Sequence, residues 1–152
     1  NESSAASDVY KRQGLEEEIK ENFKSYNVGF HRHQPEIRDF LKIEFNLDHE
    51  IIFIPHLLPL FRGEYVTLYC EVTKNDLNLN DLYENYYENH KLVRIKEQGE
   101  IAEVKDVIKT FYCDISLSYA FQSNTIVINS AIDNLLKGAA SQAIQCLDIM
   151  SN

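Results

Sequence analysis

The alternation of side chains over residues 65–72 constrains the fold more than any other feature of this sequence. One set of alternate positions is apolar: Val66, Leu68, Cys70 and Val72. The intervening positions hold polar or amphipathic side chains: Tyr65, Thr67, Tyr69 and Glu71. A period of two is typical of a β-strand that turns one face toward a hydrophobic core. The chain is therefore expected to contain a sheet with one buried face.

Other hydrophobic patterns predict the remaining elements. Apolar residues spaced four apart predict a helix from residue 15 to about residue 26, and Pro35 opens a second helix with Ile37, Phe40 and Leu41 on its buried face. Further helices are expected over residues 80–87 and 134–150, and strands over residues 51–54, 92–95, 115–121 and 125–129, the last two forming a hairpin. Because helices and strands do not alternate regularly, this order predicts an α+β domain with a mixed, largely antiparallel sheet and helices on one face.

Composition excludes several function classes. Fifteen basic against 24 acidic side chains give a net charge of −9, which argues against a general binder of nucleic acids or anionic membranes. The five glycines are isolated, so they form neither a dinucleotide fingerprint nor a phosphate loop. Three widely spaced cysteines, Cys70, Cys113 and Cys146, form no disulfide framework, and we expect a reducing, cytoplasmic setting.

The first thirteen residues differ in composition from the rest of the chain. They are rich in Ser and Ala and show no periodicity. Two interpretations remain open: a ragged or non-native tail, or a native disordered one. We therefore expect the domain to comprise residues 14–152.

Residues 29–37 are the densest group of chemically active side chains. His31, Arg32, His33 and Glu36 lie between a glycine and the start of a predicted helix. Histidine exchanges protons near neutral pH, and the spacing of two allows His31 and His33 to face together with Arg32 turned away. The nearby helix N-terminus favours an anionic ligand. Two alternatives remain open: a polar loop whose imidazoles cap helices, or a zinc site made of His31, His33 and His56.

Two further segments carry candidate binding residues. In residues 54–63 two prolines fix a bend that ends at Arg62, whose guanidinium can clamp a carboxylate or a phosphate; His56 in the same segment is expected to be structural. In residues 132–145, Asp133 or Asn134 is expected to cap the last helix, and the small residues around Gly138 allow a ligand or another backbone to approach. The alternative for this segment is a capped helix with a small packing face, whereas the functional interpretation places a nicotinamide or a substrate amide against Asn134.

Together the three segments resemble one enzyme family. They read His-Arg-His-x-Pro-Glu-Ile, Pro-His-Leu-x-Pro-x-x-Arg-Gly and Ile-Asp-Asn-Leu-x-Lys-Gly-Ala-x-x-Gln-Ala, in that order. This pattern resembles the N-acetyl-gamma-glutamyl-phosphate reductases of arginine biosynthesis, from about residue 14 to residue 152. The resemblance implies an NADP-dependent enzyme with a Rossmann domain and a second, α+β domain, similar to the C-terminal domain of glyceraldehyde-3-phosphate dehydrogenase. That second domain carries the dimer or tetramer interface, and this chain matches it alone.

The resemblance also implies a mechanism and residue roles. In such enzymes a cysteine thiolate attacks the acyl phosphate of N-acetyl-glutamyl phosphate, phosphate leaves, and hydride from NADPH reduces the thioester to the semialdehyde. Carried over by position, His31 is the expected acid/base partner and His33 the second choice. Arg32 and Glu36 are expected to hold the carboxylate and the amide of the substrate.

The same resemblance assigns the other two segments. Arg62 is expected to bind phosphate or to fix its loop. Asn134 and Gly138 are expected to lie near the nicotinamide of NADP, which the missing N-terminal domain would bind for the most part. The acyl chain of the substrate, acetylglutamyl or aminoadipyl, remains open.

The departures from the family pattern concern the nucleophile. The family's cysteine lies in a Pro-Gly-Cys-Tyr-Pro-Thr-like stretch, which this sequence lacks. We expect Cys70, Cys113 and Cys146 to be small buried hydrophobic residues instead. The chain is therefore expected to be inactive alone, because the cysteine and the Rossmann domain are missing. The alternative is a non-catalytic binding or oligomerisation module with the same fold.

Overall fold

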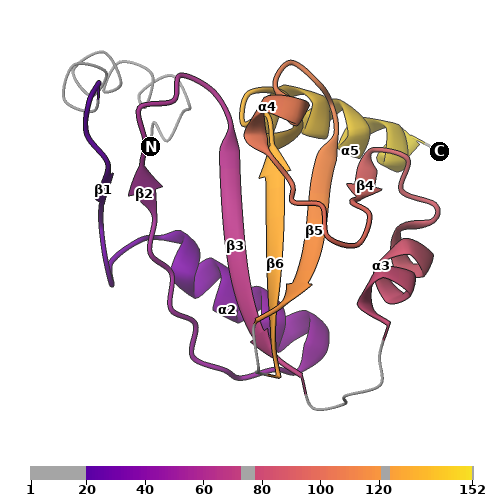
Figure 1. Cartoon of the computed structure of the whole chain (residues 1–152), viewed down its shortest axis with the longest axis horizontal. Helices are drawn as coiled ribbons and strands as arrows, with labels where there is room; N and C mark the ends of the chain where they lie inside the picture. Colours follow the sequence, from indigo (N-terminus) through magenta and orange to yellow (C-terminus); the bar gives the residue numbers. More distant parts are fainter. Residues whose placement is uncertain (1–19, 73–77, 121–123, 152) are drawn as a thin grey trace. The chain divides into compact units, whose positions relative to one another are not determined.

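A computed structural model describes residues 20–72, 78–120 and 124–151 (Figure 1). The chain divides into two compact units, Asn1–Leu60 and Phe61–Asn152. Each unit is described by itself. Residues 1–13, and residues 15–19 of the first expected helix, lie outside the described residues.

In the first unit, a short two-stranded ladder replaces the end of the expected first helix. Strand β1 (Lys24–Ser25) pairs antiparallel with β2 (His56–Leu57). The N–H of Tyr26 extends this ladder by donating to the carbonyl of Pro55 at 3.0 Å. The prediction of a helix to residue 26 is therefore wrong for its last residues, because pairing with a distant segment uses their backbone groups.

Helix α2 (His33–Phe45) confirms the second expected helix. Pro35 lies in its first turn, where no intrahelical N–H bond is lost. The helix ends at Asn46, which adopts the left-handed conformation with φ 53°. Its expected buried face is only partly correct, since Ile37 and Leu41 are half-buried but Phe40 is 57% exposed.

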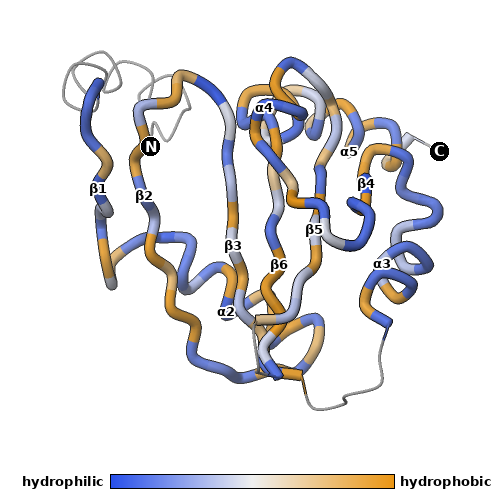
Figure 2. Tube along the Cα trace, in the orientation of Figure 1, coloured by the Kyte–Doolittle hydropathy of each residue, from blue (hydrophilic) through white to orange (hydrophobic). Residues whose placement is uncertain are grey.

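Residues 51–54 lead into β2 and form no ladder in the part of the chain that the structure describes, so the strand expected there is wrong. This apolar run is the orange stretch that approaches β2 in Figure 2. Its side chains still alternate in burial: Ile51 and Phe53 are half-buried, whereas Ile52 and Ile54 are exposed. The carbonyl of Ile51 accepts a hydrogen bond from the side-chain Nε2 of Gln34 at 2.8 Å, so a side chain takes the place of a neighbouring strand.

The second unit contains a four-stranded sheet in the order β3-β6-β5-β4. Its elements are β3 (Glu64–Glu71), α3 (Leu79–Tyr87), β4 (Val93–Ile95), α4 (Val104–Val107), β5 (Cys113–Tyr119), β6 (Thr125–Ile132), the π-helix η1 (Leu136–Ala140) and α5 (Ser141–Ser151). All strand pairs are antiparallel except the parallel pair β4–β5. The expected α+β fold with a mixed, largely antiparallel sheet is thus confirmed, and every strand expected in this unit is present with shifted ends.

The core lies where α3 packs on the sheet. Leu79 of α3 contacts a cluster of buried strand residues: Ile115, Leu117 and Ile126. The register places Leu68 opposite Ile128, and Ile128 opposite Leu117, so these three side chains share a face. Helix α3 covers this face farther along the sheet, but on β3 itself Val66 and Leu68 are 45% and 49% exposed and only Cys70 is half-buried. The buried face expected from the alternation over residues 65–72 is therefore wrong for this strand.

The short helix α4 packs on the side of the sheet opposite α3, and the sequence did not predict it. Val107 and Ala102 cluster with Ala131 of β6, and Ser116 accepts the N–H of Ala102 at 3.0 Å. Four residues are too few to show a helical period. None of the helices in the described residues combines the length and apolarity needed to cross a bilayer.

The last expected helix begins differently from its prediction. After a turn at Asn134 and Leu135, η1 makes π-type bonds, in which Gly138 donates to the carbonyl of Asp133 at 3.0 Å and Ala140 to that of Leu135 at 3.2 Å. Regular α-helix starts only at Ser141. Such π-turns occur frequently at functional sites.

Candidate functional site

The His-Arg-His segment forms the start of α2 in the first unit. A turn precedes it, in which Phe30 donates its N–H to the carbonyl of Asn27 at 3.0 Å. His31 lies just before the helix, Arg32 occupies the N-cap position and His33 is the first helical residue. The helix start thus brings these neighbouring side chains to one place.

The two imidazoles contact each other. The ring centroids of His31 and His33 lie 4.6 Å apart, and the His31 ring also packs 5.0 Å from Phe53 and 5.5 Å from Tyr26. The expectation that the two histidines face together is confirmed. Aromatic contacts on several sides restrict the orientation of the His31 ring.

Hydrogen bonding and charge set the protonation of His31. The backbone N–H of His33 donates to Nδ1 of His31 at 3.3 Å, so the neutral ring carries its proton on Nε2. Partial burial, then the positive charges of His33 and Arg32, lower the pKa of His31 below 6.5, although Glu36 opposes this. At neutral pH His31 is therefore an uncharged imidazole with a donor at Nε2.

A cavity of about 510 Å³ opens beside this histidine. Its lining includes His31, Arg32, Gln34, Arg38 and Glu50. Two guanidinium groups and one carboxylate give it a net attraction for anions. Glu36 and His33 are not among its lining residues, whereas Gln34, at the variable position of the motif, and Arg38, one residue after it, are.

Arg62 belongs to the second unit, where it forms an ion pair with Asp133. Its Nε lies 2.6 Å from Oδ2 of Asp133, whose side chain is fully buried. Asp133 also accepts backbone N–H groups from Lys109 at 2.7 Å and from Leu135 and Leu136 at 2.9 Å each. Asp133, rather than Asn134, is thus the cap of the turn that leads into the last helix.

These contacts keep the carboxyl of Asp133 ionised. Burial alone would raise its pKa, but the amides of Lys109 and Leu136, the Arg62 guanidinium and the amide of Leu135 together hold the pKa below its ordinary value of 3.8. Asp133 was expected only as a helix cap. Its role in joining separate segments depends on contacts that no sequence spacing reveals.

Asn134 and Gly138 are brought together at the same turn. Oδ1 of Asn134 accepts the N–H of Gly63 at 2.8 Å, so the other end of the amide is the donor Nδ2. Gly138 is exposed in η1, and a Cβ there would lie 3.8 Å from the Cβ of Asn134. The turn therefore presents an amide beside a position that has no side chain.

The cysteines do not have the environment of an activated nucleophile. Burial raises the pKa of the Cys70 thiol, the opposite of what thiolate formation requires. The Sγ of Cys113 lies 3.4 Å from Oγ of Ser130. Cys70 and Cys113 are half-buried, but Cys146 is exposed on α5, so its expected burial is wrong. The first turns of α5 lack the contacts that would cover it.

The alternative zinc site has no geometric support. Within residues 20–72, 78–120 and 124–151, no three His, Cys, Asp or Glu side chains are placed to hold a metal ion. His56, the third proposed ligand, instead stacks on Phe23 with ring centroids 5.1 Å apart. This contact agrees with the structural role expected for His56.

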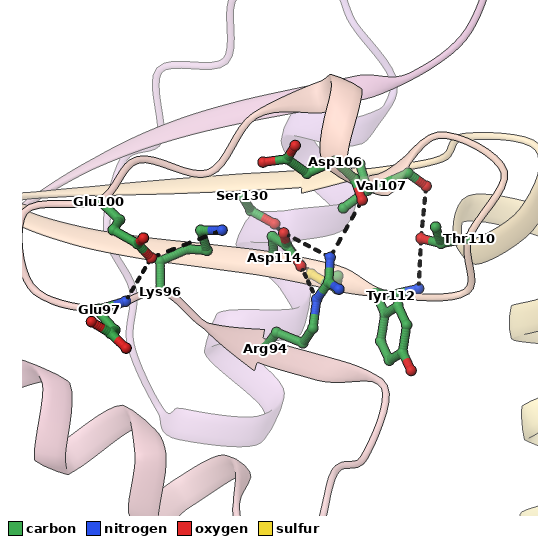
Figure 3. Close-up of polar contacts among 11 residues, drawn as sticks. Arg94, Lys96, Glu97, Glu100, Asp106, Val107, Thr110, Tyr112, Asp114 and Ser130 are labelled. Carbon is green, nitrogen blue, oxygen red and sulfur yellow. Dashed lines mark hydrogen bonds and ion pairs between the residues drawn. The ribbon is translucent and has the colours of Figure 1, made fainter.

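A second buried ion pair, which the sequence did not indicate, joins β4 to β5 (Figure 3). Arg94 Nε and Nη2 contact the two carboxylate oxygens of Asp114 at 2.6 and 2.9 Å. The guanidinium also lies 4.3 Å from the ring centroid of Tyr112 and donates to the carbonyl of Asp106 at 3.4 Å. The hydrogen bonds that Arg94 donates to Asp114 raise the pKa of Arg94. The available signal was an Asp immediately before the strand expected over residues 115–121 and an Arg within the strand expected over residues 92–95.

Comparison with known proteins assigns the family. Residues 3–134 match the family model described as "Semialdehyde dehydrogenase, dimerisation domain". The chain belongs to this family. Solved structures agree on the fold: aspartate semialdehyde dehydrogenase from Francisella tularensis aligns over 100% of this chain and 49% of its own, with a TM-score of 0.66 and 13% identity. The Vibrio cholerae aspartate semialdehyde dehydrogenase II covers 88% of this chain and 40% of its own, with a TM-score of 0.63 and 14% identity.

Curated relatives confirm the resemblance stated above. Three proteins named N-acetyl-gamma-glutamyl-phosphate reductase are similar to this member of the semialdehyde dehydrogenase family. The Brachyspira hyodysenteriae protein is 42% identical over 87% of this chain, and the Clostridium botulinum protein 43% over 88%. The Clostridium novyi protein is 37% identical over 97% of the chain. The chain spans only 38%, 39% and 43% of these relatives, respectively.

Proposed function

We propose that this chain is the C-terminal catalytic and dimerisation part of an NADP-dependent N-acetyl-gamma-glutamyl-phosphate reductase, acting in arginine biosynthesis in the cytoplasm. The observation that carries the proposal is the cavity that His31 and Arg32 share. It combines a proton-exchanging group with positive charge, as reduction of an anionic acyl phosphate requires. The relatives, 37–43% identical and named for this reaction, support it.

His31 supplies the acid/base chemistry in this proposal. Its neutral ring carries a proton on Nε2, since Nδ1 accepts the N–H of His33. The Nε2–H can donate to the acyl oxygen and stabilise the negative charge that develops there during attack by a thiolate. If the proton is transferred to that oxygen, it can return to Nε2 when the product leaves. His33 orients the ring through its N–H and remains the second choice for the acid/base role.

Positive charge in the cavity holds the substrate. Arg32 and Arg38 both line it, and a guanidinium binds a carboxylate or a phosphate with two parallel donors. Glu36 lies one turn into the same helix but does not line the cavity, so its proposed role, accepting the acetamido N–H, requires the substrate to extend beyond the cavity. This division of roles favours N-acetyl-glutamyl phosphate, whose reduction gives N-acetyl-glutamate semialdehyde.

Arg62 fixes its loop in this account. Its Nε is held by the buried Asp133, so at least part of its charge is neutralised within the fold. A phosphate ligand would have to compete with that carboxylate. We therefore assign Arg62 to loop fixation, the second of its two expected roles.

The turn at Asn134 fits the nicotinamide end of NADP. The donor end of the Asn134 amide can reach a carboxamide oxygen. Gly138 is exposed beside it, and a Cβ there would lie 3.3 Å from the side chain of Ile132, so the turn packs closely at the glycine. When bound, NADPH supplies the hydride for the reduction. Most of the cofactor would be held by the Rossmann domain that the rest of the enzyme provides.

Alone, the chain is proposed to be inactive and to assemble as a homo-dimer or tetramer once joined to that domain. The test is to mix it with the separately produced part of the Clostridium botulinum relative that it does not match. We expect NADPH oxidation that depends on the acyl phosphate and on both parts. A folded, associated mixture without this activity would reject the proposal.

One observation favours a second candidate, a non-catalytic binding or oligomerisation module. Helix α5 buries none of its side chains and exposes Ile144, Leu147 and Met150 at 66%, 64% and 85%. Apolar exposure of this kind marks a surface that a partner covers. The module predicts a stable oligomer of the chain alone and no activity in the mixture.

A further inference from the structure

In the described part of the second unit, two carboxylates are fully buried with closely similar pairing: Asp114 and Asp133. Each has an arginine Nε at 2.6 Å from one of its oxygens. Asp114 joins neighbouring strands of the sheet through Arg94. Asp133, in contrast, lies just after β6 and contacts segments that carry proposed site residues. The pair therefore offers a natural comparison between a purely structural carboxylate and one beside a site.

Both carboxylate oxygens of Asp133 are occupied by partners within the protein. Oδ1 accepts the N–H groups of Leu135 and Leu136, and Oδ2 accepts that of Lys109 and contacts Arg62. A buried carboxylate with four such partners is stabilised in its charged form and offers little to a ligand. Any effect of Asp133 on a reaction must therefore pass through the groups it holds.

Two consecutive contacts link the segment before β3 to the turn after β6. The first is the ion pair of Arg62 with Asp133, and the second is the hydrogen bond from the N–H of Gly63 to Oδ1 of Asn134 at 2.8 Å. Gly63 has φ +114°, and a side chain there would overlap Val104. Val104 packs close to Gly63, and Asp133 holds the preceding residue, Arg62. These two contacts restrain the Gly63 N–H, and the hydrogen bond to that N–H orients the Asn134 amide.

We propose that Asp133 is a positioning residue that, by holding Arg62, orients the Asn134 amide with its donor end toward the ligand. The inference rests on the proposed function, in which Asn134 contacts the nicotinamide end of the cofactor. Loss of the Asp133 charge weakens the first contact, lets the 61–63 segment move and releases the Asn134 oxygen. The binding of the cofactor then suffers more than the turnover of the complex that still forms.

The test compares D133N with D114N in the two-part enzyme. Both changes remove one negative charge from a fully buried, arginine-paired carboxylate and keep its shape. We expect D133N to raise the KM for NADPH about tenfold with a smaller change in kcat, as displacement of a positioning group does. D114N is expected to lower stability and leave the KM for NADPH within twofold. Equal KM values in the two variants would overturn the proposal.

A second measurement, on the 152-residue chain, separates this inference from the proposed function. Amide hydrogen exchange by NMR reports directly on the Gly63 N–H. In D133N we expect its protection to fall at least tenfold, while the amides of the β5–β6 ladder keep theirs. Unchanged protection at Gly63 rejects the inference even if the enzyme is active. Lost protection in an enzyme without any activity rejects the proposed function alone.

If D133N does not fold, R62K serves in its place. A lysine keeps the charge but lacks the planar group that contacts Oδ2. The same loss of Gly63 protection and the same rise in KM are expected, in weaker form. Wild-type protection and wild-type KM in a folded R62K protein would contradict the proposal.

Discussion

His33 donates its backbone N–H to Nδ1 of His31 at 3.3 Å, and the two imidazole rings lie 4.6 Å apart. The arrangement makes the protonation of one histidine depend on the other. Because the His33 N–H already points at Nδ1 of His31, a proton added to Nδ1 would face that N–H, which would lose its acceptor. The charge of a protonated His33 adds to the effect.

The first prediction concerns this titration. NMR titration of the His31 ring should give a pKa below 6.5 in the wild-type chain. H33N removes a positive neighbour and should raise the pKa of His31, whereas E36Q removes a negative one and should lower it. Shifts in the same direction for both variants would contradict the electrostatic account.

The sign of the accompanying stability change follows from proton linkage. Between its folded and unfolded pKa values, His31 binds fewer protons in the folded chain than in the unfolded one. Folding stability should therefore rise with pH through this window, be complete above 6.5 and decrease as the pH falls below it. Urea unfolding of wild type and H31N at pH 5 and 7.5 measures this, and the pH-dependent difference should shrink in H31N.

A second prediction concerns the cations of the cavity. R32Q and R38Q each remove a guanidinium from its lining, so the KM for the acyl phosphate should rise about tenfold or more in the two-part enzyme. The KM for NADPH should stay near its wild-type value, since the arginines are assigned to the substrate alone. K42Q is a matched control, because Lys42 lies on α2 outside the lining and pairs with Asp48. An equal rise in this KM with K42Q would show that the loss of any positive charge on α2 weakens substrate binding, and would contradict a specific site.

The Arg94–Asp114 pair yields a prediction of stability. R94M leaves the carboxylate of Asp114 buried without its partner, and we expect a loss of about 2–3 kcal/mol in the free energy of unfolding. We expect a smaller loss than for an ion pair with both side chains fully buried, because the Arg94 side chain is 41% exposed and water screens its charge. Denaturation in urea gives the value. A loss under about 0.5 kcal/mol would mean that water replaces the arginine.

Two glycines with positive φ separate backbone strain from steric overlap. G29A and G63A both place an alanine in the left-handed region, at φ +77° and +114°. A Cβ at Gly29 meets nothing within 4 Å, so G29A should cost only about 1–2 kcal/mol. G63A should cost more because its Cβ overlaps Val104, and the double variant G63A/V104A should lose less than the sum of its two single variants.

The sheet was predictable because its signal is local. The alternation over residues 65–72 depends only on the period of a strand, and the strand is present at Glu64–Glu71, although Val66 and Leu68 remain exposed on it. The first helix failed at its end because Lys24 and Ser25 pair with residues some thirty positions away. The π-turn at Leu136–Ala140 escaped because its start is held by Asp133, whose partners include the distant Lys109 and Arg62.

The same division applies to the candidate site. The contact of His31 with His33 follows from a spacing of two at the start of a helix, so sequence alone indicated it. The contact between Gly63 and Asn134 joins residues 71 positions apart, and no local pattern encodes it. Sequence reasoning thus found the residues of each segment but not the bonds that orient them.

The rate of NADPH oxidation by the two-part enzyme, with wild-type chain and with H31N, tests the central claim most directly. Asparagine keeps a polar group near Nδ1 but cannot exchange a proton at neutral pH. We predict acyl-phosphate-dependent oxidation with the wild-type chain and a loss of about a hundredfold or more in kcat with H31N. An H31N enzyme that assembles equally well and retains kcat within twofold would contradict the assignment of His31 as the acid/base residue.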